Sequence, residues 1–434
     1  MRYYLFMLLV LVQGLYGWRI HRHGKHLEFL IKSGRNNVDL AEQWFTQILD
    51  HTNSDDGRTW QQRFYVNDEF HSNNGPAFLF IGGEGEMSPY WATNGAWVQH
   101  ARKFKALCFV VEHRFYGKSQ PTGDLTTESL QYLSSEQALH DLKYFINEMS
   151  VKYGLDHNAK WVAFGGSYSG ALAAWLRLKF PDLVHGAVAS SAPILAKVDF
   201  SDDKFHLCEP IENSVNNSKH ISTLYLSIAS KFAETVQYND QLQTQITNVC
   251  NTMNNEKNGE PIDRLAAVVS SDDCLYYNYS GIVDSLMDTK VIPENMFRQW
   301  TYQTCTEFGF YATSSAHPSV FGHGFPVEYF IEMCSDTFGQ QFNADYINSQ
   351  VKDTNRRYGG LKINVTNVVF VHGSIDPWHA LGLTQTRNPE VPVIFIKGTS
   401  HCADMADDNS PKMQAVRERI SGYIGQWLSE VLKQ

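Results

Sequence analysis

One ten-residue stretch, Trp161 to Gly170, constrains the fold of this chain more than any other. A short apolar run suited to a buried strand ends at two glycines, and a helical pattern of small and apolar residues starts just after Ser167. A strand, a sharp turn and a helix are therefore predicted. Backbone approaches backbone closely in such a turn, so small residues are needed around the serine, whose hydroxyl is left exposed at the apex. This arrangement is typical of a nucleophile elbow.

The match to the elbow pattern G-x-S-x-G has one departure. The pattern has glycine two residues after the nucleophile, whereas Ser169 occupies that position and Gly170 follows it. Serine is small enough for the turn, but glycine-rich turns that contain a serine also occur without catalysis. The rest of the chain has to decide between these two interpretations.

Apolar runs typical of strands alternate with amphipathic segments typical of helices along most of the chain. Besides the elbow, strands are predicted at 41–50, 59–66, 76–81, 106–111, 186–191, 367–373 and 391–396, and helices at 134–149, 171–180 and 411–432. The first two strands form an edge hairpin in this interpretation. The spacing of the others fits right-handed crossovers, which predict a parallel sheet with helices on both faces.

The alternation stops between Pro193 and about Tyr358, where helical stretches dominate. We interpret this block as a helical cap inserted between strands of an α/β-hydrolase fold, where it would narrow access to Ser167. The predicted divisions are a signal peptide at 1–17, a first part of the hydrolase domain at 18–193, the cap at 194–358, and a second part of the hydrolase domain at 359–434.

The first residues and the overall charge indicate where the protein works. An apolar run from Tyr3 to Val12 follows Arg2 and is too short to span a bilayer, so a cleaved signal peptide is predicted. The mature protein is expected to be secreted or lysosomal, with no membrane anchor. Its net charge of -10 argues against a nucleic-acid partner. The seven cysteines contain no Cys-x-x-Cys pair, so a structural zinc site is not expected.

Three residues suited to nucleophilic catalysis occur in the order Ser167, Asp376, His401, each after a predicted strand. A serine hydroxyl needs a base to remove its proton, and an imidazole does so when a carboxylate fixes its tautomer and angle. The order is that of α/β hydrolases and differs from the trypsin and subtilisin orders. The sequence therefore predicts a catalytic triad, which needs no metal and no cofactor.

Other residues were weighed against these three. His372 and His379 flank Asp376 and could line the pocket or be satisfied loop histidines. Asp404 could replace Asp376 as the orienting acid, but we interpret it as a solvated loop carboxylate. His140 and Asp141, on the helix before the elbow, are interpreted as surface residues.

The glycine-rich loop Gly82 to Glu86 follows the strand at 76–81. It has neither Walker nor Rossmann spacing, and its two carboxylates, at Glu84 and Glu86, would repel phosphate. An oxyanion donor is the better interpretation, because hydrolases of this architecture take one N–H from such a loop and another from the residue after the nucleophile. The predicted donors are Gly83, Glu84 and Tyr168.

The chain resembles the family of serine peptidases that includes lysosomal Pro-Xaa carboxypeptidase, dipeptidyl peptidase II and thymus-specific serine protease. The resemblance is carried by residues 47–51, 60–67, 82–85, 112–117, 165–170, 190–193, 304–307, 376–378 and 401–405. It covers nearly the whole mature chain and is strongest to the thymus-specific type, through residues 302–311. It implies the triad Ser167, Asp376 and His401, a helical domain over the site, cleavage of peptides, often next to proline, and a possible homodimer.

Two departures from the family pattern bear on specificity. Members that release dipeptides or cut after proline carry an acidic segment after the equivalent of Phe310, whereas Ser314 to Phe321 contains no carboxylate. A helical segment of the cap is also missing between Phe200 and Lys204. The resemblance implies disulfides Cys208–Cys274 and Cys305–Cys334, and it leaves Cys108, Cys250 and Cys402 unpaired, because the usual partner of Cys250 would lie in the missing segment. Cys108 is interpreted as a buried apolar residue of its strand.

Sequons at Asn216, Asn278 and Asn364 predict glycosylation in the secretory pathway. Two other functions remain open at this point. A lipase or esterase would use the same elbow and triad with an open apolar groove, and a non-catalytic binding protein could keep the fold. The residue preferred at the cleaved bond and the end of the peptide that is gripped do not follow from the sequence.

Overall fold

The computed structural model describes residues 40–72, 75–155, 159–200, 216–239, 245–269, 275–315 and 323–429, which excludes the expected signal peptide. Their main feature is an eight-stranded sheet with the strand order β1-β2-β4-β3-β5-β6-β9-β10. The strands are β1 Gln43–Ile48, β2 Thr59–Asn67, β3 Ala77–Ile81, β4 Leu107–Val111, β5 Trp161–Gly166, β6 Val184–Ser190, β9 Val368–Gly373 and β10 Val393–Ile396.

Most of the sheet is parallel, as predicted. The strands β4, β3, β5, β6, β9 and β10 pair in parallel with their neighbours. β1 and β2 form the predicted edge hairpin, in which Trp44 pairs with Arg63, and β2 is antiparallel to β4. Parallel strands place their carboxyl ends at one edge, so the loops after β3, β5, β9 and β10 lie together there.

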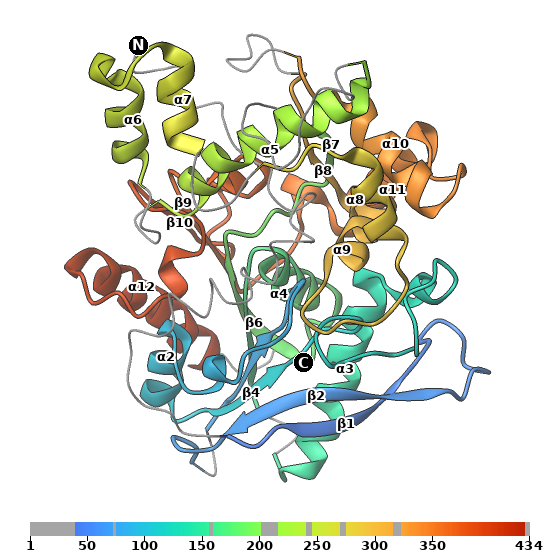
Figure 1. Cartoon of the computed structure of the whole chain (residues 1–434). Coiled ribbons are helices and arrows are strands. Elements are labelled where there is room, and N and C mark those ends of the chain that lie inside the picture. Colours follow the sequence, from blue (N-terminus) through green and yellow to red (C-terminus); the bar gives the residue numbers. More distant parts are fainter. Residues whose placement is uncertain are drawn as a thin grey trace.

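Helices cover both faces of the sheet (Figure 1). α3 (Ser135–Lys152) and α4 (Tyr168–Lys179) share one apolar cluster with the sheet, and α2 (Ala96–Phe104) and α12 (Pro411–Ser429) share another. The alternation along β3 explains this, because Leu79 contacts the first cluster while Phe78 and Phe80 contact the second. The sequence analysis did not predict α2.

Between β6 and β9 the chain forms the helix-rich block that the sequence predicted, which Figure 1 shows in the upper half of the molecule. Its elements are β7 Lys197–Phe200, α5 Ser218–Gln237, α6 Ile246–Asn254, α7 Pro261–Val269, α8 Tyr279–Met287, α9 Phe297–Gln303, a π-helical turn Thr304–Phe308, β8 Gly309–Ala312, α10 Val327–Phe338 and α11 Ala344–Tyr358. We call this block the insertion. A shared apolar cluster joins it to the sheet loops, through Phe115, Tyr116 and Trp378.

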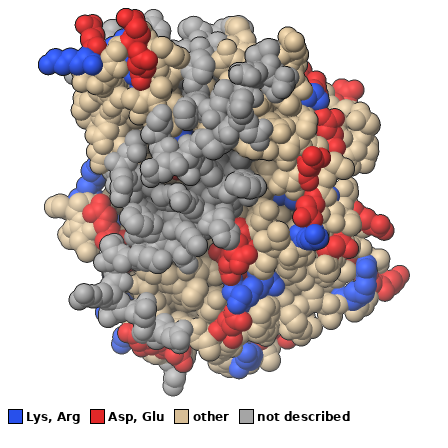
Figure 2. Space-filling model, in the orientation of Figure 1, with Lys and Arg blue, Asp and Glu red and all other residues tan. Residues whose placement is uncertain are grey.

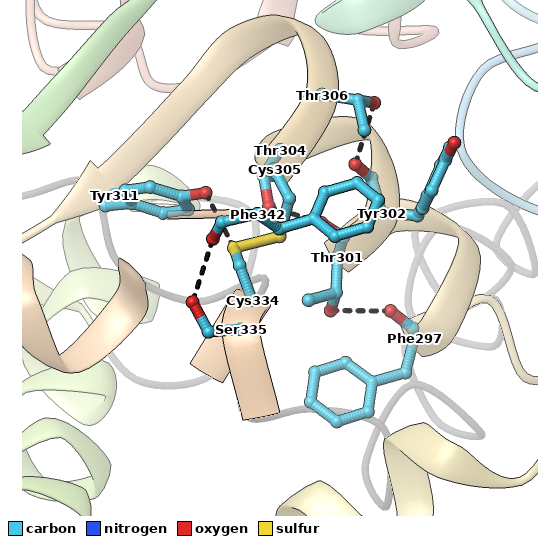
Figure 3. The surroundings of a disulfide bond; sticks show 10 residues. All are labelled: Phe297, Thr301, Tyr302, Thr304, Cys305, Thr306, Tyr311, Cys334, Ser335 and Phe342. Atoms are coloured by element: carbon cyan, nitrogen blue, oxygen red, sulfur yellow. Dashed lines mark hydrogen bonds between the residues drawn. A yellow bond between two sulfur atoms is a disulfide. The ribbon is translucent and has the colours of Figure 1, made fainter. Parts of the chain in front are cut away.

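A disulfide between Cys305 and Cys334 links the π-helical turn to α10 (Figure 3). It confirms one of the two predicted pairs. The other pair, Cys208 and Cys274, lies outside the described residues. Cys108 is a free, fully buried thiol of β4, as interpreted from the sequence, and Cys250 and Cys402 are free and partly exposed.

No helix of the described residues is both long enough and apolar enough to span a membrane. Figure 2 shows carboxylates at the right of one face, where Figure 1 places α10 and α11, with lysine and arginine side chains between them.

Candidate active site

Ser167 occupies the turn between β5 and α4 with φ 56° and ψ -129°. A residue with a side chain rarely adopts a positive φ, and such a conformation costs about 1–3 kcal/mol. The neighbouring structure imposes it, because the Ser167 N–H donates to the carbonyl of Ser190 at the end of β6, at 2.8 Å. The backbone therefore has the strained geometry expected of a nucleophile elbow.

The glycines of the elbow are explained by close contacts. A Cβ atom at Gly165 would lie 2.1 Å from the carbonyl oxygen of Ser169, and one at Gly170 would lie 2.7 Å from that of Ser190. Gly170 thus fills the packing role of the last glycine in the pattern. Ser169 contributes instead through its hydroxyl, which donates to the Gly166 carbonyl at 2.8 Å and accepts from the Gly166 N–H at 3.1 Å. Ser169, which occupies the position where the pattern has glycine, thus closes the turn with two hydrogen bonds.

Asp376 and His401 lie on the loops that follow β9 and β10, and their side chains meet. The Nδ1 atom of His401 is 2.9 Å from Oδ1 of Asp376, and both residues are almost fully buried. Because a carboxylate only accepts hydrogen bonds, Nδ1 carries a proton, and in the neutral imidazole Nε2 keeps its lone pair. The N–H of Trp378 donates to the same carboxylate oxygen at 3.0 Å and fixes its position.

Burial opposes charge on both partners, but their mutual attraction outweighs it. The carboxylate is held in its charged form, with the pKa of Asp376 below the ordinary value of 3.8. The same interaction, together with a smaller contribution from Cys402, raises the pKa of His401 well above 6.5. The pair therefore stabilises an imidazolium, the species that forms when His401 accepts a proton.

The segment that carries His401 packs directly on the elbow. A Cβ atom at Gly166 would lie 2.3 Å from Sδ of Met405 and 3.1 Å from Sγ of Cys402. The N–H of Cys402 donates to Oγ of Ser191, just beyond β6, at 2.9 Å. Residues 401–405 and the Ser167 turn thus share one small region at the carboxyl edge of the sheet.

The glycine-rich loop after β3 lies beside the same turn. A Cβ atom at Gly83 would be 3.6 Å from Cβ of Ser169. Tyr168 is the first residue of α4, and the N–H groups of a first helical turn have no partner within the helix. Gly83 is thus close to the Ser167 turn and Tyr168 directly follows Ser167, and oxyanion binding by Gly83, Glu84 and Tyr168 stays a prediction.

A buried polar network lies beneath α4, and the sequence analysis did not find it. The Tyr168 hydroxyl accepts from Nε2 of Gln303 at 3.0 Å and is 3.1 Å from Nε2 of His113. Burial lowers the pKa of His113 to about 4, so this imidazole is neutral. Gln303 also accepts from Tyr116 and donates to Glu307. Gln303 and Glu307 belong to the insertion, so the network ties the insertion to the residue that follows the nucleophile.

Asp141 is not a surface residue, contrary to its interpretation from the sequence. It is 1% exposed, and Arg114 binds both of its carboxylate oxygens at 2.6 Å. The imidazole of His51 contacts the same carboxylate at 2.8 Å. This cluster holds the loop after β4, whereas the neighbouring His140 is partly exposed.

The side chains of the rival residues do not hydrogen-bond to the Asp376 carboxylate or to the His401 ring. His372 is fully buried and does not hydrogen-bond to Asp376 through either ring nitrogen, and His379 contacts the backbone carbonyl of Asp376 through Nδ1. Asp404 is 5% exposed and accepts from the hydroxyl of Ser190. The interpretation of Asp404 as a solvated carboxylate is therefore wrong.

The remaining predicted modification sites are at or near the surface. Asn216 and Asn364 are exposed, and Asn278 is partly buried with its side-chain oxygen capping α8. Their glycosylation stays a prediction.

Within the described residues, no cluster of three His, Cys, Asp or Glu side chains could hold a metal ion.

A family model described as Serine carboxypeptidase S28 matches residues 47–204 and 201–420 of the chain. The chain belongs to this peptidase family. The two matched ranges overlap at residues 201–204, and the missing cap segment expected there stays a prediction. The fold is accordingly an α/β hydrolase and the protein is a serine-type peptidase.

Several known proteins align with most of the sequence of this S28 peptidase. The putative serine protease K12H4.7 of Caenorhabditis elegans is 36% identical over 468 residues, which cover 91% of this chain and 89% of the relative. The thymus-specific serine protease of Mus musculus is 32% identical over 453 residues, with coverages of 90% and 88%. The lysosomal Pro-X carboxypeptidase of Homo sapiens is 27% identical over 422 residues, with coverages of 85% and 83%.

Among solved structures, the peroxisomal alpha-beta-hydrolase Lpx1 of Saccharomyces cerevisiae matches with a TM-score of 0.39 at 13% identity, covering 91% of this chain and 89% of that one. Membership of the S28 family implies that the substrates are peptides. Together with the Cys305–Cys334 disulfide, it indicates a protein of the secretory pathway.

Proposed function

We propose that this S28 peptidase hydrolyses short peptides as an exopeptidase, through an acyl-enzyme formed on Ser167. The observation that carries the proposal is the buried pair of Asp376 and His401 on a segment packed against the strained Ser167 turn. The Ser167 turn and the Asp376–His401 pair, from three distant parts of the chain, lie at one edge of the sheet, which supports the roles of nucleophile, acid and base that we assign to them. Such convergence is what acyl transfer requires.

In the proposed mechanism, Oγ of Ser167 attacks the carbonyl carbon of the scissile bond, and Nε2 of His401 accepts the hydroxyl proton. The imidazolium is stabilised by the Asp376 carboxylate, to which it donates through Nδ1. When the tetrahedral intermediate collapses, His401 gives this proton to the leaving amine. A water molecule then repeats the sequence on the ester, which releases the acid and restores Ser167.

The developing oxyanion needs donors that are already in place. We assign this role to the N–H of Tyr168, at the start of α4, and to the N–H groups of Gly83 and Glu84. The proximity of Gly83 to Ser169 supports the assignment. The positive end of the α4 dipole acts in the same direction.

Residues of the insertion, which we interpret as a cap at 194–358, contact the site and favour small substrates. The carbonyl of Gln237, at the end of α5, accepts from the His401 N–H at 2.9 Å, and the Tyr238 ring lies 6.1 Å from the His401 ring. A Cβ atom at Gly85 would lie 3.6 Å from the methyl group of Met296, next to α9. A folded polypeptide would not pass beneath these contacts, which supports exopeptidase action.

Aromatic rings beside His401 could accept a proline ring. The Trp378 ring lies 6.3 Å from His401 and 5.3 Å from Phe310. Proline packs well on aromatic faces, and the name of one relative, lysosomal Pro-X carboxypeptidase, indicates cleavage next to proline. We therefore assign to this enzyme, secreted or lysosomal, a preference for proline beside the cleaved bond.

The homodimer expected from the resemblance is a separate prediction. The mass of the purified protein in light scattering tests it.

The test is mass-spectrometric profiling of a defined peptide library with the purified protein at acidic and neutral pH, with S167A as the control. We expect removal of one or two residues from short peptides, strongest next to proline, and no products with S167A. Cleavage inside long peptides would contradict exopeptidase action. Turnover of p-nitrophenyl esters without turnover of any peptide would favour the esterase alternative.

A further inference from the structure

A second carboxylate, Asp404, is buried close to the proposed triad and has no part in the mechanism above. It is 5% exposed, and its side-chain partner is the hydroxyl of Ser190, which donates to Oδ2 at 2.5 Å. Buried carboxylates are normally paired with a cation, because burial of an isolated charge is costly. Asp404 has instead a neutral hydroxyl partner.

Asp404 is connected to the elbow through Ser190. The carbonyl of Ser190 accepts the Ser167 N–H, while the hydroxyl of the same residue binds Asp404. Asp404 lies three positions after His401 on the same segment, and Met405 packs on Gly166. The carboxylate thus joins the segment that holds the imidazole to the strand end that holds the nucleophile.

The charged and titratable groups around Asp404 come from several elements. Asp376, on the loop after β9, opposes its charge, and His401, on its own segment, favours it. His100, on α2, lines the same small cavity beneath the elbow together with Trp97, Phe164 and Ile420 of α12. His100 contacts Ser421 through Nδ1, and burial lowers its pKa to about 4, so it is neutral.

We propose that Asp404 is a positioning residue that sets the pH dependence of the triad, by holding a proton at acidic pH and a charge at neutral pH. The inference rests on the proposed function of Ser167, Asp376 and His401. In its neutral form Asp404 keeps the link to Ser190 without attracting a proton to His401. In its charged form it raises the share of the resting enzyme in which His401 is already protonated and cannot accept the serine proton.

The direction of each effect follows from the surroundings. Burial raises the pKa of Asp404 to about 6, although the Ser190 hydroxyl acts in the opposite direction. Above that pH the charged carboxylate raises the pKa of His401, so a larger share of the enzyme carries an imidazolium that cannot act as a base. The two groups titrate as a coupled pair, with the largest effect where both change charge.

The experiment measures the rate of covalent labelling by a fluorophosphonate between pH 4 and pH 9, in the wild type and in D404N. Asparagine keeps an acceptor for Ser190 but carries no charge. Relative to the plateau of each protein at pH 9, we expect D404N to be labelled about three- to fivefold faster than the wild type near pH 6, and at nearly the same rate at pH 4. A residue that only supports the fold would change the rate by one factor at every pH.

The matched control is D407N, which removes an exposed carboxylate three residues further along the same segment. We expect its normalised profile to coincide with that of the wild type. An equal shift in D407N would overturn the inference, because it would show an effect of net charge.

S190A is the second variant. Loss of the hydroxyl donor raises the pKa of Asp404 further, so the inflection of the labelling rate against pH should move to higher pH.

Thermal unfolding of D404N gives an independent measurement. The folded pKa of Asp404 lies above its ordinary value of 3.8, so its contribution to stability is complete below about pH 4 and is lost as the pH rises through 6. The melting temperature of D404N relative to the wild type should therefore rise from pH 4 to pH 7.5. A constant difference would contradict the inference.

The outcomes separate the two proposals. If the wild type is not labelled at any pH, the proposed function fails and the inference fails with it. If the wild type is labelled and the normalised profiles of wild type and D404N coincide, the inference alone is refuted.

Discussion

The sheet and the insertion contribute to the candidate site in different ways. Ser167, Asp376 and His401 lie on loops that leave strands of one sheet, so the backbone determines where they lie. The insertion adds contacts around them, from the Gln237 carbonyl and the Gln303 amide. In the proposed function, the sheet supplies the reacting groups while the insertion sets access and rigidity. Substitutions in the two regions should therefore have different effects on the rate of catalysis and on stability.

The largest effect is expected from D376N. Asparagine can still accept the Trp378 N–H, but it no longer stabilises the correct tautomer and charge of His401. We expect kcat for a peptide substrate to fall about 10³- to 10⁴-fold. The melting temperature should change little. A fall of less than tenfold would show that another group orients His401.

A substitution in the sheet region that leaves the reacting groups untouched should act on stability instead. D141N would leave the guanidinium of Arg114 buried without its bidentate partner. The expected loss is about 3–5 kcal/mol of unfolding free energy, measured by denaturant titration.

The control is E136Q on the same helix, which breaks an exposed ion pair between Glu136 and Arg357. Exposed pairs contribute about 0–1 kcal/mol, so this variant should unfold close to the wild type. Equal losses of unfolding free energy in D141N and E136Q would contradict the claim that burial makes the Asp141–Arg114 pair the more important of the two.

The smallest of these effects is expected in the insertion, from the double variant C305S/C334S. The disulfide closes a loop with a sequence separation of 29, for which chain-entropy arguments give roughly 3.6 kcal/mol. Hydrogen exchange should become faster in 297–358 and stay slow in β5 and α4, with C250S unchanged as the control. Uniformly faster exchange would show that the sheet depends on the insertion for its stability.

The sequence predicts the sheet region better than the insertion, for physical reasons. Buried parallel strands are short apolar runs, and the Ser167 turn is marked by small residues that close contacts require. The structure confirms the edge hairpin, the helices on both faces of the sheet and the Cys305–Cys334 pair. The triad, its oxyanion donors and the cap boundaries stay predictions.

What the sequence missed depends on partners far away in the chain. Asp141 and His140 are adjacent, yet one is buried because Arg114 reaches it from another segment. Asp404 is buried because Ser190, more than two hundred residues earlier, binds it. Local patterns report periodicity and bulk, and they do not reveal which distant side chain satisfies a charge.

The central claim is that Ser167 is the nucleophile at the edge of the sheet where Asp376 and His401 meet. The most direct measurement is fluorophosphonate labelling of the purified protein, followed by mass spectrometry of its peptides. We predict one adduct on Ser167 in the wild type and no labelling of S167A. Labelling of S167A at the rate of the wild type would contradict the account.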